Sequence, residues 1–129
     1  MEKTITLTLS RKQAKVIQAA LDSYSRLKCG QVAYAIEHLN MDRPTDEWLS
    51  RDQVDEIENF VRERAFKDAL SKGHYYGVRS HEVSDKARIA YDLIQTIRYY
   101  YRNEDLKNTV DNHPPMKTST TEELPIVKD

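Results

Sequence analysis

The chain has one cysteine, and it contains no long apolar segment. A single cysteine, Cys29, excludes an internal disulfide framework of the kind found in small secreted proteins. No run of apolar residues approaches the roughly 18 that span a bilayer or form the core of a signal peptide. We therefore expect a protein of the reducing cytoplasm with no membrane partner.

An excess of charge of one sign is also lacking, since 20 basic residues face 21 acidic ones. A chain near neutrality has no overall field to hold it on DNA or on an anionic membrane. Any nucleic-acid site would have to be a local basic patch, so nucleic acid is not the expected partner.

The composition that is present is that of one folded domain. Hydrophobic residues make up 39% of the 129 residues and charged residues 32%, which is more apolar than disordered chains. From Asn103 onward, polar residues and prolines dominate, and they can bury too little apolar area to offset the entropy of ordering. We expect a single domain over residues 1–105 and a flexible tail over residues 106–129.

A short strand is predicted at the N-terminus, because residues 4–9 alternate threonine with Ile5, Leu7 and Leu9. A strand needs a partner, and the sequence offers only a weak one at residues 75–78 or the same strand of another subunit.

Helices account for most of the remaining domain. Ser10 with Gln13 and Ser50 with Gln53 are capping boxes, which predict helices over about 11–28 and from 51 to about 70. Gly30 is a natural C-terminal cap, and a short helix should follow it and end near residue 40. Ser84 starts a last helix with an apolar stripe centred on Ile94. The fold class is mainly α (small α+β), with three to four helices.

Two of these segments resemble small proteins encoded by tailed bacteriophages. The likeness covers roughly residues 5–36 and 74–102 and is carried by residues 20–26, ALDSYSR, by Gly30-Gln31, and by residues 83–98, VSDKARIAYDLIQTIR. This resemblance implies a phage protein that acts in the host cytoplasm. It carries no known activity over to this chain.

Catalytic motifs are missing. The four histidines lack the close spacing of a zinc site, and Cys29 has no second cysteine, so we expect neither a metal nor another cofactor. Cys29 would be a nucleophile only if a histidine and an acid converged on it, and a buried structural thiol is the expected alternative. The sequence contains no phosphate loop, dinucleotide fingerprint or carboxylate pair, which favours a protein that is not an enzyme.

One segment gathers groups that could bind a ligand. Aromatic faces stack on bases, guanidinium groups bind phosphates, and the two nearby glycines, Gly73 and Gly77, permit unusual backbone angles. The candidate ligand-binding residues are His74, Tyr75, Tyr76, Arg79, His81 and Arg88. The plainer alternative is a surface loop whose tyrosines cover helix ends.

Two further contacts are expected. Residues 99–102, Tyr-Tyr-Tyr-Arg, place rings around most of a helix end, which suggests a subunit interface in a homo-oligomer. Arg26 and Asp92 lie on the two phage-like segments, and a partly buried ion pair between them would account for both.

These observations favour a phage accessory binding protein for host takeover or anti-defence, with a host protein or a nucleotide-type small molecule as its partner. The expected ligand is a nucleotide-derived host defence signal held at the Tyr/Arg/His loop. A DNA- or transcription-associated regulator is the first alternative, and a small nucleotide hydrolase that uses His74 or His81 is the second.

Overall fold

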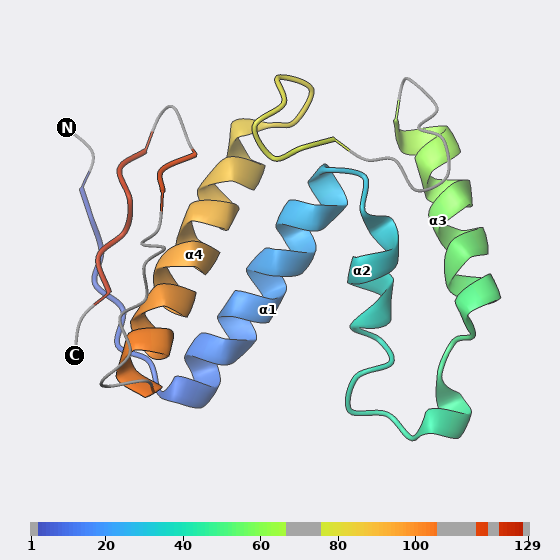
Figure 1. Ribbon diagram of the computed structural model, residues 1–129, viewed down its shortest axis with the longest axis horizontal. Coiled ribbons are helices and arrows are strands. Elements are labelled where there is room, and N and C mark those ends of the chain that lie inside the picture. Colours follow the sequence, from blue (N-terminus) through green and yellow to red (C-terminus); the bar gives the residue numbers. More distant parts are fainter. Residues whose placement is uncertain (1–2, 67–75, 106–115, 119–121, 128–129) are drawn as a thin grey trace.

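The computed structural model describes residues 3–66, 76–105, 116–118 and 122–127 (Figure 1). Within them lie the helices α1 (Arg11–Lys28), α2 (Val32–Glu37), α3 (Arg51–Ala65) and α4 (Asp85–Asp105). A 3₁₀ helix, η1 (Thr45–Glu47), lies between α2 and α3. The described part is therefore mainly helical, as the sequence predicts, and none of its helices is long and apolar enough to cross a membrane.

The α-helices stand in a row in the order α4, α1, α2, α3 (Figure 1). Helix contacts within the described residues join α4 to α1, α1 to α2, and α2 to α3. The helices α1 and α3 run in the same direction, and α2 and α4 run in the opposite one (Figure 1). The described helices thus form a single layer with two open faces.

Both predicted capping boxes are present. The Ser10 hydroxyl accepts from the Gln13 backbone N–H at 3.1 Å, and the Gln13 side chain accepts from the Ser10 N–H at 2.9 Å. Ser50 and Gln53 repeat this arrangement at the start of α3. Each box satisfies backbone donors that the first turn of a helix leaves without partners. The predicted starts of α1 and α3 are therefore confirmed.

Gly30 ends α1 as predicted. Its φ of 89° lies in the left-handed region that favours glycine. The Gly30 N–H donates to Leu27 O at 3.1 Å and the Gln31 N–H donates to Arg26 O at 2.8 Å, which is the Schellman arrangement. This tight turn reverses the chain, so that α2 runs back beside α1.

The core lies between α1 and α4. Ala87, Ala90 and Ile94 on α4 are 0%, 3% and 1% exposed, and Ala14 on α1 is also buried. The three alanines let the two helix backbones approach closely, and Ile94 is the largest fully buried side chain among the described residues. The buried Ser25 hydroxyl donates to Ala87 O at 3.2 Å, which joins the helices by a polar contact as well.

The outer helix α3 is held by two polar links. Glu58 Oε2 accepts from the Ala33 N–H at the start of α2, at 2.6 Å. The buried Asn40 side chain accepts from Leu49 N at 2.8 Å and donates to Leu49 O at 3.3 Å, which closes the connection between α2 and α3. Two helices end earlier than predicted. α2 stops at Glu37 instead of near residue 40. α3 stops at Ala65 instead of near residue 70, because Phe66 has extended backbone angles of φ −112° and ψ 126°.

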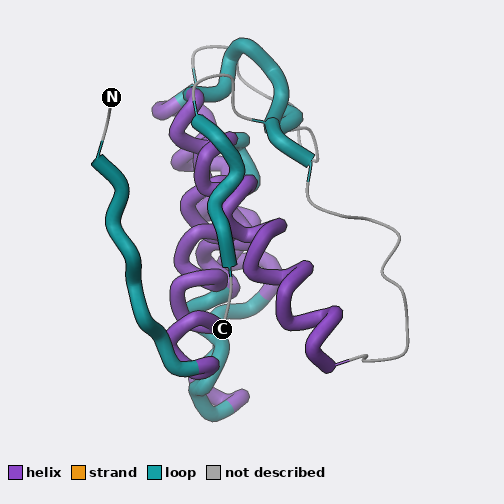
Figure 2. The backbone as a smooth tube through the Cα atoms, turned by 90° about the vertical axis from the view of Figure 1, so that its left-hand side faces the viewer, coloured by secondary structure: helices purple, strands orange, loops and turns teal. Residues whose placement is uncertain are grey.

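The predicted N-terminal strand is wrong for the described residues. Residues 3–9 form an irregular segment (Figure 2), with Ile5 90% and Leu7 65% exposed. The expected partner does not pair with it, because the Tyr76 N–H donates to Cys29 O instead, and Tyr75 lies outside the described residues. An alternating pattern without a neighbouring backbone forms no ladder.

The expected flexible tail is described only at residues 116–118 and 122–127. There Thr118 contacts α4: its N–H donates to Asp92 Oδ1 at 2.8 Å, and its hydroxyl lies 2.5 Å from that oxygen and 3.2 Å from Arg88 O. Gln95 exchanges hydrogen bonds with the Met116 backbone at 3.0 and 3.4 Å. Residues 116–118 therefore cover the side of α4 that bears the buried Asp92.

We expect Ile94→Asp to lower the free energy of unfolding by about 4 kcal/mol or more, because it buries a charge in the core between α1 and α4. Urea unfolding followed by circular dichroism measures this. Ile126→Asp is the matched control, since Ile126 is 86% exposed, and its effect should stay below about 0.5 kcal/mol. Equal stability of both variants would contradict the assigned core.

We expect Thr118→Val to cost about 1–2 kcal/mol, because the buried Asp92 carboxylate loses a hydroxyl partner while the shape of the side chain is kept. Thermal melting of the full chain measures it. The exposed Thr6→Val is the control. If the two variants melt together, the docking of residues 116–118 does not contribute to stability.

Candidate functional site

The candidate loop lies between α3 and α4, and its described part is residues 76–84. His74 and Tyr75, two of the predicted ligand-binding residues, lie outside the described residues. The remaining four, Tyr76, Arg79, His81 and Arg88, are described, and they fall into two groups: two that hold the loop and two that face solvent.

Tyr76 holds the start of the loop against α1. Its N–H donates to Cys29 O at 2.9 Å, and its side chain packs with Val78 on the buried cluster of Cys29, Val83 and Ala87. Its ring centroid lies 6.2 Å from that of Phe66. Tyr76 thus covers helix ends, as the plainer reading of the sequence expects.

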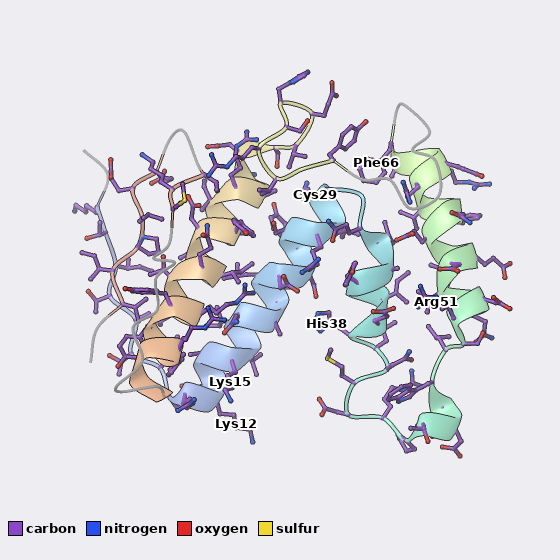
Figure 3. All side chains as sticks on the ribbon, in the orientation of Figure 1. Lys12, Lys15, Cys29, His38, Arg51 and Phe66 are labelled. Carbon is purple, nitrogen blue, oxygen red and sulfur yellow. The ribbon has the colours of Figure 1, made fainter. Side chains whose placement is uncertain are left out.

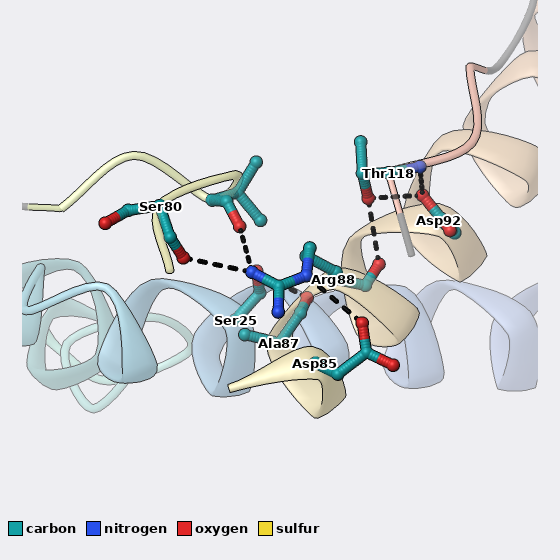
Figure 4. A network of polar contacts seen from close by, with 8 residues as sticks. Ser25, Ser80, Asp85, Ala87, Arg88, Asp92 and Thr118 are labelled. Carbon is teal, nitrogen blue, oxygen red and sulfur yellow. Dashed lines mark hydrogen bonds and ion pairs between the residues drawn. The ribbon is translucent and has the colours of Figure 1, made fainter. Parts of the chain in front are cut away.

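Arg88 holds the middle of the loop (Figure 4). Its guanidinium donates to Val78 O at 3.3 Å and to Ser80 O at 3.0 Å, and its Nε pairs with Asp85 Oδ1 at 3.1 Å. The side chain is only 14% exposed. Arg88 therefore serves as a clamp between the loop and α4. The donors that a ligand would need are already engaged in these contacts.

Arg79 and His81 face solvent. Arg79 stands between the two residues whose carbonyls Arg88 holds, and its own side chain is exposed. The His81 side chain is 92% exposed, with Nε2 3.1 Å from Glu82 Oε1. These two side chains are presented by a backbone that Tyr76 and Arg88 keep in place.

Turns shape the loop without help from a left-handed glycine. Ser80 N–H donates to Gly77 O at 2.9 Å, and Val83 N–H donates to Ser80 O at 3.0 Å. Gly77 does not use the freedom that its lack of a side chain permits, because among the described glycines only Gly30 has positive φ. Gly73 lies outside the described residues.

Cys29 is a structural thiol in this arrangement (Figure 3). It is 4% exposed, in the cluster that Tyr76 covers. Burial raises the pKa of the Cys29 thiol above its ordinary value of 9.0, and the charges of Arg26 and Arg88 oppose this only in part. Such a thiol stays protonated at neutral pH, which does not suit a nucleophile.

The predicted ion pair between Arg26 and Asp92 is wrong, because each residue has other partners. Arg26 Nε lies 3.0 Å from Asp22 Oδ1 on its own helix, and its guanidinium donates to Gln31 Oε1 at 2.6 Å and stacks 4.4 Å from the Tyr34 ring. Asp92 accepts from Thr118 on the other side of α4. Arg26 therefore joins α1 to α2 at the Gly30 turn.

The subunit interface predicted at residues 99–102 stays a prediction. Tyr101, in the aromatic run proposed as a subunit interface, lies under Arg11, whose guanidinium carbon is 5.0 Å from the ring centroid. No group of three or more His, Cys, Asp or Glu side chains is placed to hold a metal ion in the ranges that the structure covers. The Thr118–Asp92 contact was not predicted, since its partners are 26 residues apart and no local pattern links them.

We expect Arg88→Met to lower the free energy of unfolding by about 2–3 kcal/mol and to speed amide hydrogen exchange in residues 78–83, because the loop carbonyls lose charge-assisted donors. Thermal melting and exchange mass spectrometry measure the two effects. The exposed Lys86→Met, two residues earlier on α4, is the control. Unchanged exchange in Arg88→Met would show that the clamp does not order the loop.

Comparison with known proteins adds no assignment: no family model, no curated protein and no solved structure matches this chain.

Proposed function

We propose that this chain is a non-catalytic binding protein that recognises an anionic, nucleotide-type ligand at the 76–82 loop. The observation that supports this best is the position of Arg79. Its neighbours on both sides, Val78 and Ser80, are held through their carbonyls by Arg88, while Arg79 itself extends into solvent. A guanidinium on a backbone that is already ordered binds phosphate without the entropic cost of ordering the loop.

Two further basic residues follow Arg79 closely in the sequence, and an anionic ligand would replace Glu82 as the partner of His81. His81 is exposed two residues further on, and Lys86 is exposed in the first turn of α4. The Arg88 charge is paired with Asp85, so it supports the loop and leaves ligand contact to the exposed groups. In this proposal Arg79 and His81 contact the ligand, and Tyr76 and Arg88 position them.

The biological setting in the proposal comes from the phage-like segments. A small phage protein that binds a nucleotide-derived signal would lower its free concentration in the host and so blunt a defence response. Sequestration needs affinity and an amount of protein that matches the ligand. It needs no reaction, which suits a loop built from binding groups.

We expect the full chain to bind ATP or a cyclic dinucleotide in isothermal titration calorimetry, and Arg79→Ala to weaken that binding at least tenfold. Loss of a charge-assisted contact to phosphate accounts for such a decrease. The melting temperature should not change, because Arg79 is exposed. Arg51→Ala is the control, since this exposed arginine lies at the start of α3, away from the loop (Figure 3).

Small molecules released by denaturing the protein from infected cells, identified by mass spectrometry, extend the test beyond these two probes. A retained nucleotide would support the proposal, and a converted nucleotide would favour the hydrolase. The proposal would be refuted if titration with the probes produced no binding heat and denaturation released no nucleotide.

A further inference from the structure

Basic residues gather where α1 begins and α4 ends. Residues 11–21 of α1 contain three basic and no acidic residues, and residues 93–102 of α4 contain two basic and no acidic ones. These five residues, here the basic cluster, are all exposed: Arg11, Lys12, Lys15, Arg98 and Arg102. Because the whole chain has a net charge of −1, this concentration of positive charge is a local feature.

The tertiary structure brings the two parts of the basic cluster together. The helices α1 and α4 pack side by side in opposite directions, so the start of α1 lies beside the end of α4 (Figure 1). The guanidinium carbon of Arg11 lies 5.0 Å from the centroid of the Tyr101 ring, which joins the two ends directly. Lys12 and Lys15 lie at this end of α1 (Figure 3).

On α1, the basic side chains lie to one side of the contact with α4. Ala14 is buried on the side that faces α4, three turns before Ser25, whose hydroxyl donates to α4. At about 100° per residue, Arg11 and Lys15 are turned from Ala14 by about 60° and 100° in the same sense. Lys12, at about 160°, follows on the outer edge of the same face.

On α4, the two arginines lie on the same face of the helix pair. The buried Ile94 faces α1, and Arg98 and Arg102 are turned from it by about 40° and 80°. A rotation in the same sense leads to the same face in two helices that run in opposite directions. The α1 and α4 parts of the basic cluster therefore leave the pair on one face.

Folding by itself does not favour this arrangement. Each helix carries a pair of like charges four residues apart: Arg11 with Lys15, and Arg98 with Arg102. Like charges at this spacing destabilise a helix, and the packing of α1 on α4 brings the two pairs together. An anionic partner would turn this repulsion into attraction.

Acidic residues are scarce around the basic cluster. The first acidic residue of α1 is Asp22, and it is paired with Arg26 at 3.0 Å. On α4, no acidic residue occurs in the sequence between the buried Asp92 and Glu104. The positive charge of this face is therefore available to a partner from outside the chain.

The extent of the basic cluster indicates a polymer of phosphates. Four residues span about 6 Å along a helix, and the axes of packed helices lie about 8–10 Å apart. Cations spread over such an area exceed the reach of one phosphate group, whereas the phosphates of a nucleic-acid strand recur about every 3.4 Å along the duplex axis. Neither residues 11–15 nor residues 93–102 add a large exposed apolar side chain that could insert into a bilayer.

We propose that the basic cluster binds the phosphate backbone of a nucleic-acid duplex. Each arginine can hold two phosphate oxygens, and the Tyr101 ring keeps the Arg11 guanidinium in place. Such contacts fix the position of a duplex without reading its bases. The cluster lies at the opposite end of α4 from the 76–82 loop, so this binding goes beyond the proposed recognition of a nucleotide and does not depend on it.

Fluorescence anisotropy with a labelled DNA duplex of about 20 base pairs tests the surface with the full chain. The logarithm of the affinity should fall linearly with that of the NaCl concentration, with a slope between about −3 and −4.5, because each neutralised phosphate releases about 0.9 counterion. Lys15→Gln and Arg98→Gln should each reduce this slope by about 1 and weaken binding at least about threefold at low salt. Circular dichroism checks the fold, and Lys15→Ala and Arg98→Ala replace any variant that does not fold.

Arg51→Gln is the control, because it removes the same charge from an exposed position on α3, away from the cluster (Figure 3). It should leave the affinity and the slope unchanged. No binding at low salt would overturn the proposal, as would an equal loss in Arg51→Gln and the cluster variants. Equally strong binding to polyglutamate, or binding only to vesicles that contain phosphatidylserine, would also overturn it, since the partner would then be an acidic protein or a membrane.

Discussion

The close contact between α1 and α4 is the interaction on which the other described elements depend. Ala14, Ala87 and Ala90 keep the helix axes near each other, and Ser25 donates across the gap to Ala87 O. The end of α1 then carries the turn into α2, and the start of α4 carries the clamp on the loop. A larger residue at position 87, which is 0% exposed, would displace both ends at once.

The loop of the candidate site is held in place by the two helix ends that this contact brings together. Cys29, at the end of α1, accepts from Tyr76, and Arg88, in the first turns of α4, holds the carbonyls on either side of Arg79. The four described candidate residues therefore have two roles. Tyr76 and Arg88 hold the loop, whereas Arg79 and His81 are exposed on it. This division explains how a short loop can hold an exposed arginine in place beside a helix start.

The single-row arrangement leaves large apolar side chains exposed on the described helices. In the row α1 has a neighbour on each side, yet only Ala14 and Ser25 of this helix are buried, and α3 contacts only α2 among the described helices. Apolar side chains on α1 and α3, among them Val16 and Phe60, consequently remain exposed.

The sequence by itself determined the elements whose signals are local. Ser10 with Gln13, Ser50 with Gln53, and Gly30 satisfy backbone groups within a few residues, so the helix starts and the end of α1 were predictable. The helical period likewise placed Ile94 in the core. The fold class followed, since long stretches of the chain carry such signals.

Only the tertiary structure decided which polar groups meet. Ser25 bonds a residue 62 positions away, and Asp92 bonds one 26 positions away, so neither contact leaves a periodic trace in the sequence. The role of Arg88 was likewise not predictable, because an arginine suits a phosphate site and a carbonyl clamp equally well. The alternation at residues 4–9 wrongly predicted a strand, because a strand forms only when another backbone supplies its hydrogen bonds.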